Sequence, residues 1–170
     1  MQYVYKYMDT PVGRLTLIAA DEGLAAILWE NDNPGRVQPK ATIYDDSHPI
    51  LLETTQQLEE YFAGTRHHFT VKLAPVGTSF QQEVWTALSA IPYGQTRSYT
   101  QIADQLGRPK AVRAVGAANG RNPISIIVPC HRVIGASGAL TGFAGGLKTK
   151  AALLSLEGIR QRDTQIAIEW

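Results

Sequence analysis

The chain has 170 residues, 44% of them hydrophobic and 18% charged, and a net charge of +1. This length corresponds to one domain or two small ones sharing a core, and the composition is typical of a folded soluble protein. No apolar run reaches the roughly 18 residues of a membrane span, and the first residues lack the pattern of a signal peptide. The single cysteine excludes an internal disulfide and a cysteine-rich zinc site, so we expect a reducing, cytoplasmic location.

Charge is divided unevenly along the chain. Residues 1–78 carry 6 Lys and Arg against 10 Asp and Glu, a net of −4, whereas residues 79–160 carry 9 against 3, a net of +6. A basic second half indicates a polyanionic partner such as nucleic acid. Dispersed surface charge would give the same totals, so charge alone leaves both interpretations open.

Residues 1–78 are expected to form a small mixed domain. Apolar alternation and turn residues predict antiparallel strands at 2–8, 14–20 and 24–30, and a loop over 31–46. Apolar side chains at helical spacing predict a helix that opens at Ser47 and ends at Gly64, and the span 70–77 is expected to return to strand and then to pass into a linker. His67 and His68 are adjacent, which is the wrong spacing for two metal ligands on one helix face.

Residues 79–160 are expected to be mainly helical. The predicted helices cover 79–91, a short segment opened by a Ser98/Gln101 capping box, 110–119 with Pro109 in its first turn, and 147–156. The two middle helices have helix-turn-helix spacing, a weak signal by itself. The expected fold class is therefore α+β: an N-terminal domain with an antiparallel sheet, a winged-helix-like C-terminal domain, and a tail at 161–170.

The helix expected over 110–119 has small side chains on most of its surface. Ala114, Gly116 and Ala117 would let its backbone approach a nucleic-acid groove, although tight packing against another helix needs the same residues. An interior glycine costs about 0.5–1 kcal/mol of helix stability, so close approach must bring a compensating gain. Arg113 points away from the apolar face of this helix and favours the groove.

The most informative stretch is VPCHRVI, residues 128–134, where an apolar run ends and presents the only cysteine. His131 and Arg132 beside Cys130 would favour the thiolate, which is the nucleophilic form. Glu157 follows the last predicted helix, where a carboxylate faces the negative end of the helix dipole and gains from a buried cation. His131 is the expected partner, giving a Cys-His-Glu relay. An inert buried cysteine and a solvated glutamate remain the alternative.

VPCHRVI resembles the active-site signature of the methylated-DNA–protein-cysteine methyltransferases, which repair 6-O-alkylguanine. The resemblance covers nearly the whole chain: residues 80–91, 94–106, 108–122, 142–147 and 153–158 are similar, in order, to the family's DNA-binding domain. Residues 1–78, including EYFAG at 60–64, resemble the variable N-terminal domain. The length is similar to the constitutive bacterial Ogt type.

The resemblance implies a role for each matching residue. Cys130 would accept the alkyl group, His131 would act as base through a water, and Glu157 would orient His131. Asn122 would support the site through a hydrogen-bonded turn, and Tyr99 would help to protonate the departing guanine. The implied DNA contacts are Arg113 as the finger that replaces the flipped nucleotide, with Tyr99, Ala114, Gly116, Ala117 and Arg132 around it. The implied base pocket consists of Val128, Pro129, Phe143 and Ala144.

The implied partner is double-stranded DNA containing alkylated guanine, with no cofactor, no metal, no membrane and no obligate protein partner. Alkylthymine as a second substrate and cooperative assembly along DNA are left open. Three other functions compete: a damage binder without catalysis, which would lack Cys130; a cysteine hydrolase, which would not need the basic half; and a transcriptional regulator, which leaves Cys130 without a role.

Overall fold

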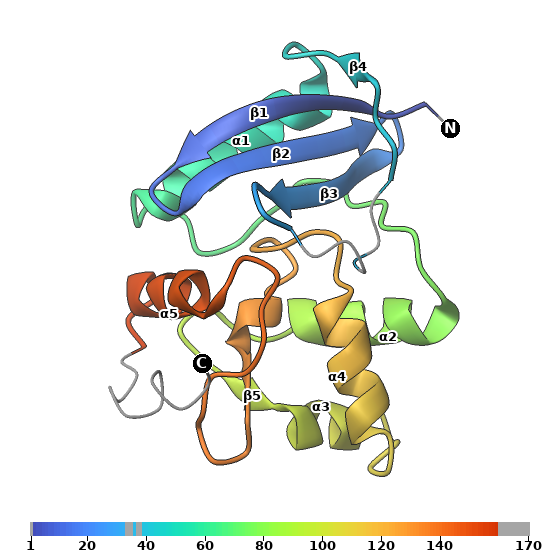
Figure 1. Ribbon diagram of the computed structural model, residues 1–170, viewed down its shortest axis with the longest axis vertical. Helices are drawn as coiled ribbons and strands as arrows, with labels where there is room; N and C mark the ends of the chain where they lie inside the picture. Colours follow the sequence, from blue (N-terminus) through green and yellow to red (C-terminus); the bar gives the residue numbers. More distant parts are fainter. Residues whose placement is uncertain (1, 33–35, 37–38, 160–170) are drawn as a thin grey trace. The chain divides into compact units, whose positions relative to one another are not determined.

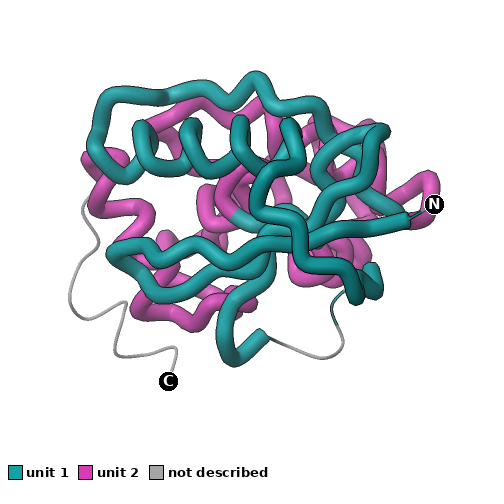
Figure 2. The backbone as a smooth tube through the Cα atoms, turned by 90° about the horizontal axis from the view of Figure 1, so that it is seen from above, with its two compact units in different colours: residues 1–76, 123–125 teal, residues 77–122, 126–170 magenta. Residues whose placement is uncertain are grey.

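The computed structural model describes residues 2–32, 36 and 39–159 (Figure 1). The chain divides into two compact units, which Figure 2 shows in different colours. Unit 1 comprises Met1–Val76 and Pro123–Ser125, and unit 2 comprises Gly77–Asn122 and Ile126–Trp170. The segment 123–125, which precedes the cysteine by a few residues, is therefore part of the N-terminal unit.

Unit 1 is a four-stranded sheet with one helix on one face (Figure 1). Its strands are β1 (Val4–Thr10), β2 (Gly13–Ala20), β3 (Gly23–Trp29) and β4 (Ile43–Tyr44), in the order β3-β2-β1-β4. The first three pair antiparallel, as their alternating apolar residues predict, and β4 pairs parallel with β1. The helix, α1 (Pro49–Phe62), buries Leu51, Leu58 and Tyr61.

Segment 71–74 lies against β3, where Gly23 allows its close approach. Leu24 N donates to Lys72 O and Ala74 N donates to Leu24 O, both at 2.8 Å. A Cβ atom on Gly23 would stand 2.7 Å from Lys72 O, closer than such atoms approach, and Gly23 has a φ of 149°. This contact is a single bridge between Leu24 and Leu73, so the strand expected at the start of 70–77 is reduced to one bridged residue.

Unit 2 is mainly helical and contains a helix-turn-helix. Its helices are α2 (Ser79–Ser89), α3 (Tyr99–Gln105), α4 (Val112–Gly120) and α5 (Leu147–Leu156). The Ser98/Gln101 capping box opens α3 as expected, and Gly107 has the positive φ of a helix stop. Trp85 of α2 donates its indole N–H to Ala118 O of α4 at 2.9 Å, which ties the second helix of the motif to the unit's core.

Two short strands, β5 (Arg97–Ser98) and β6 (Val133–Ile134), pair in parallel. One immediately precedes α3 and the other immediately follows the cysteine segment. Their pairing therefore brings Tyr99, the first residue of α3, near the chain that leaves Cys130.

Several expected boundaries are corrected by the structure. Helix α4 begins at Val112, and Pro109 lies in a turn before it, outside the first helical turn where it was expected. Helix α1 is capped by His48, whose ring accepts from Ile50 N, and Ser47 lies outside it. The tail at 161–170 falls outside the described residues. None of the helices in the described part of the chain is long and apolar enough to cross a membrane.

Candidate active site

A sharp turn at Pro129 positions Cys130. The φ and ψ of Pro129, −82° and 63°, form an inverse γ-turn in which Cys130 N donates to Val128 O at 2.8 Å. The chain then enters a 3₁₀ turn, η1 (Cys130–Arg132). The apolar run before Cys130 is therefore a series of turns. Cys130 is 5% exposed.

The turn before the cysteine is held by two buried residues. Asn122 is 1% exposed, and its side-chain amide nitrogen donates to Val128 O at 2.8 Å. Val128 O therefore accepts two hydrogen bonds, one from Asn122 and one from Cys130 N. Ile126 is fully buried with a φ of 73°. A β-branched residue in this region stores strain of about 1–3 kcal/mol and persists only where its surroundings fix it. The supporting turn expected at Asn122 is thus present.

His131 and Glu157 form a buried pair. Nε2 of His131 lies 2.7 Å from Oε2 of Glu157, and neither side chain is exposed. Burial lowers the pKa of His131 below its usual 6.5; the hydrogen bond and charge of Glu157 oppose this effect, while the charges of Arg132 and Lys150 reinforce it. The ring is therefore neutral at pH 7. Its other nitrogen, Nδ1, is buried without a protein hydrogen-bond partner, and a neutral ring with Nε2 donating to Glu157 has a lone pair there.

Arg132 also contacts Glu157, which corrects an expectation. Its Nε lies 2.8 Å from Oε1 and its Nη2 lies 3.1 Å from Oε2, while Nη1 donates to Ile91 O at 2.7 Å. The residue is 6% exposed, so its assignment as a DNA contact is wrong. Glu157 is the C-cap residue of α5, and the cation that offsets its repulsion from the helix dipole is Arg132, where His131 was expected. His131 contributes a hydrogen bond.

Tyr99 points from α3 toward the segment between β6 and α5. Its hydroxyl lies 2.5 Å from Oγ1 of Thr141. A Cβ atom on Gly116 would stand 3.9 Å from the Tyr99 ring, which is ordinary contact distance. Gly116 is half-buried and lies beside Tyr99, which was also expected at the DNA surface.

The remaining expected residues divide between surface and interior. On α4, Arg113, Ala114 and Ala117 are exposed, as a helix presented to a partner requires. Val128 and Pro129 are buried, and Phe143 and Ala144 are half-buried in the segment before α5.

Lys150 and Thr141 are absent from the residues expected at this site. Lys150 is fully buried, and its Nζ donates to Val133 O at 2.7 Å and to Thr141 O at 3.0 Å. The available signal was its spacing on α5: Lys150 lies three residues after Leu147 and four before Leu154, on the buried face. Thr141 gave no signal, because its contact with Tyr99 spans 42 residues of sequence.

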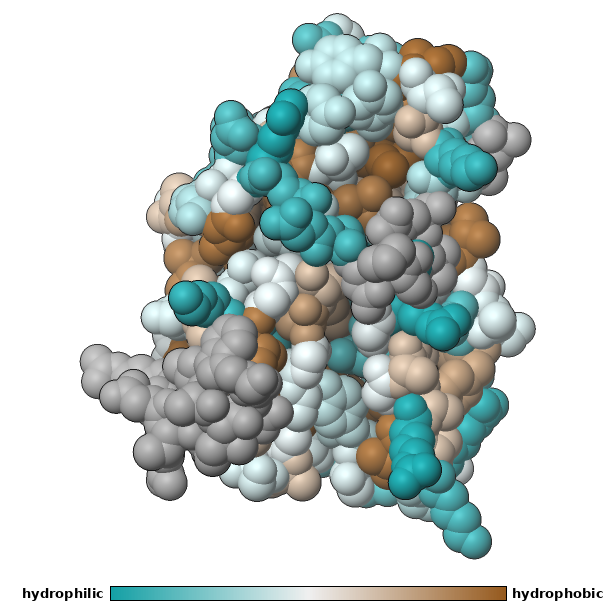
Figure 3. Space-filling view, in the orientation of Figure 1, coloured by the Kyte–Doolittle hydropathy of each residue, from teal (hydrophilic) through white to brown (hydrophobic). Residues whose placement is uncertain are grey.

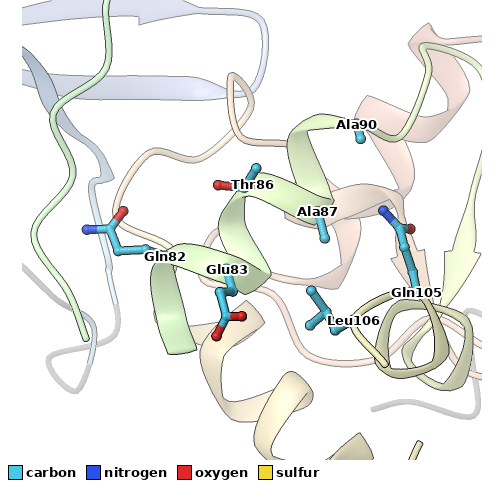
Figure 4. A pocket seen from close by; sticks show the side chains of 7 residues that line it. All are labelled: Gln82, Glu83, Thr86, Ala87, Ala90, Gln105 and Leu106. Atoms are coloured by element: carbon cyan, nitrogen blue, oxygen red, sulfur yellow. The ribbon is translucent and has the colours of Figure 1, made fainter. Parts of the chain in front are cut away.

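A separate hollow of about 460 Å³ lies between α2 and the end of α3 (Figure 4). None of the candidate active-site residues lines it; the lining residues are Gln82, Glu83, Thr86, Ala87, Ala90, Gln105 and Leu106. On the face drawn in Figure 3, hydrophobic and hydrophilic side chains are interspersed. No group of three or more His, Cys, Asp or Glu able to hold a metal ion occurs among the described residues.

Comparison with known proteins identifies relatives over both units. Residues 79–159 match the family model "6-O-methylguanine DNA methyltransferase, DNA binding domain", and residues 3–75 match the "ribonuclease-like domain" of the same family. A methylated-DNA–protein-cysteine methyltransferase of Methanosarcina acetivorans is 50% identical over 91% of this chain and 97% of its own. The constitutive enzyme of Bacillus subtilis is 46% identical over 94% of this chain and 98% of its own.

Solved structures agree with the sequence comparison. The crystal structure of Mycobacterium tuberculosis OGT in complex with DNA has a TM-score of 0.83 and 50% identity to this chain, covering 91% of it and 93% of the OGT chain. The α+β fold class expected from the sequence is thereby confirmed. With both family models matched along its length, the chain belongs to the 6-O-methylguanine DNA methyltransferases.

Proposed function

We propose that this protein repairs 6-O-alkylguanine in double-stranded DNA by transferring the alkyl group irreversibly to Cys130. The observation that carries the proposal is the only cysteine, turned by Pro129 beside a neutral buried His131 that is paired with Glu157. The relatives supply the substrate class, because they are methylated-DNA–protein-cysteine methyltransferases and one is solved with DNA.

Each residue of the site carries out a separate step of the alkyl transfer. Nδ1 of His131 takes the thiol proton through a bridging water, and Glu157 holds the ring in the required tautomer. The sulfur of Cys130 attacks the alkyl carbon, so that an S–C bond forms as the C–O6 bond of guanine breaks. Tyr99 gives its hydroxyl proton to the departing guanine. The product is a thioether, which has no carbonyl for water to attack, and each protein molecule therefore acts once.

The alkylated base must leave the duplex to reach a buried thiol, which costs a few kcal/mol. The small, exposed residues Ala114 and Ala117 would let α4 lie close to the DNA, and the exposed Arg113 would fill the vacated position in the stack. Gly116, half-buried beside the Tyr99 ring, would likewise present little side chain to the DNA. The flipped base would be received by Val128, Pro129, Phe143 and Ala144.

The test is transfer of a labelled methyl group from DNA containing 6-O-methylguanine. The label should appear on the wild-type protein and should be absent from Cys130→Ala, which should still bind DNA because the charge and α4 are unchanged. Label that appears on Cys130→Ala, or release of labelled methanol in place of transfer, would reject the proposal. Release of methanol would instead indicate a hydrolase.

Three finer proposals accompany this one. A cytoplasmic location is supported by a catalytic thiol, which needs a reducing compartment. The protein needs no obligate protein partner, and cooperative assembly along DNA would appear as a sigmoidal binding curve. Repair of 4-O-alkylthymine would use the same attack on a saturated carbon, and a labelled alkylthymine duplex tests it.

A further inference from the structure

The Tyr99–Thr141 contact joins two segments that secondary structure does not connect. Tyr99 begins α3, and Thr141 lies without regular structure between β6 and α5, yet their hydroxyl oxygens are 2.5 Å apart. Both residues belong to unit 2. The contact therefore depends on how firmly the segment around Thr141 is held.

Buried groups hold the segment around Thr141 in place. The carbonyl of Thr141 accepts from Lys150 Nζ at 3.0 Å, and the same ammonium group donates to Val133 O at 2.7 Å. Leu140, the preceding residue, is fully buried. The methyl group of Thr141 faces Gly135, where a Cβ atom would lie 3.7 Å from it. Backbone and methyl are thus fixed, which directs the hydroxyl at Tyr99.

The chemistry assigns this hydroxyl a role during transfer. A hydroxyl group has one proton to donate and lone pairs to accept with. When Tyr99 gives its proton to guanine, negative charge develops on the phenol oxygen, and a neighbouring donor stabilises that charge. The hydroxyl of Thr141 lies at hydrogen-bond distance from this oxygen and can turn its own proton toward it.

We propose that Thr141 is a positioning residue for alkyl transfer: its hydroxyl holds the Tyr99 phenol in place and donates to the phenol oxygen as Tyr99 protonates the departing guanine. The inference rests on the proposed function of Tyr99. The Tyr99 O–H bond breaks and an N–H bond forms on guanine, while the proton of Thr141 stays on its own oxygen. The proton that His131 took from the thiol returns to the tyrosinate through solvent, so protons balance.

The experiment compares single-turnover rates of methyl transfer from duplex DNA for four single variants and one double variant. Thr141→Val keeps the methyl and the shape but removes the hydroxyl, and it should slow transfer about 3- to 10-fold, the value of one hydrogen bond. Thr141→Ser keeps the hydroxyl and should stay within about twofold of wild type. Thr86→Val, an exposed threonine on α2, is the matched control and should not change the rate.

Tyr99→Phe separates positioning from a merely structural effect. In the Tyr99→Phe background, adding Thr141→Val should change the rate by less than about twofold, because the phenol oxygen it serves is gone. Duplex affinity and Tm of Thr141→Val should match wild type.

Three outcomes would each overturn the inference. Thr141→Val could transfer as fast as wild type, Thr141→Val could slow the wild-type and Tyr99→Phe proteins equally, or Thr141→Ser could transfer as slowly as Thr141→Val. A Tyr99→Phe rate equal to wild type would overturn it too, by removing the proton donor. These outcomes differ from failure of the proposed function, in which the wild-type protein itself would take up no label.

Discussion

Arg132 binds both carboxylate oxygens of Glu157, with Nε 2.8 Å from Oε1 and Nη2 3.1 Å from Oε2. This bidentate contact keeps the buried carboxylate charged and fixed in orientation. Its Oε2 is then held 2.7 Å from His131 Nε2. Arg132, two residues after the cysteine, therefore supports the base His131 through Glu157.

Glu157→Gln should both destabilise the protein and slow the transfer. The substitution leaves Arg132 buried without a counter-charge, which typically costs about 3–5 kcal/mol of unfolding free energy. It also removes the anion that orients His131, so transfer at pH 7 should slow, and the slowing should shrink at high pH, where the thiolate forms unaided.

The double variant Glu157→Gln/Arg132→Met separates the two effects. Removing the unpaired cation should recover part of the lost stability in urea unfolding but leave the transfer slow. Recovery of the rate together with stability would mean that Glu157 serves only the fold.

The stability of the protein should fall as the pH falls below 6.5, through His131. Burial depresses the folded-state pKa of His131, so below about 6.5 the unfolded chain binds a proton that the folded chain does not. Its contribution is thus fully present above pH 6.5 and is lost as the pH falls toward the depressed folded-state pKa. Urea unfolding at pH 7.5 to 5 measures it. The unfolding free energy of His131→Gln should fall less over this pH range than that of wild type. An equal fall in both proteins would show that His131 does not cause the pH dependence.

Arg113→Ala should impair transfer from duplex DNA far more than transfer from a free alkylated base. Arg113 is the large side chain on the exposed face of α4, and its loss removes the group that fills the vacated stack position. Lys110→Ala, which removes one exposed positive charge nearby, is the matched control and should reduce duplex affinity only modestly. If Arg113→Ala slows both substrates equally, Arg113 acts on the pocket or the fold.

Binding to undamaged duplex should be sequence-independent and should weaken steeply with salt. The excess of 9 Lys and Arg over 3 Asp and Glu in residues 79–160 predicts contacts with phosphates. The slope of log affinity against log salt should be about −0.9 per phosphate neutralised. A flat dependence, measured by fluorescence anisotropy, would show that the basic half does not face the DNA backbone.

Local signals predicted much of the fold. The capping box at Ser98 and the apolar spacing of 147–156 placed two helices correctly, and alternation placed the ends of three strands within two residues. These features depend on residues close in sequence. Strand β4 has only two residues and pairs with β1, which is distant in sequence, so no local pattern predicts it.

The sequence indicated which residues meet at the candidate site but not where each side chain points. The expected contact between His131 and Glu157 is present, whereas Arg132, expected at the DNA, is buried. In a 3₁₀ turn adjacent side chains point in directions that an extended segment does not allow, and this turn buries Arg132 against Glu157. Thr141 and Lys150 act through backbone carbonyls and a hydroxyl brought together only by folding, which residue type and spacing do not encode.

The most direct test of the account is the stoichiometry of transfer. Wild-type protein is incubated with excess duplex carrying labelled 6-O-methylguanine, and the label per protein is followed by mass spectrometry. The account predicts a plateau near one methyl group per chain, located on Cys130, because the thioether is irreversible. Sustained turnover well beyond one equivalent, or a plateau with the label on another residue, would contradict it.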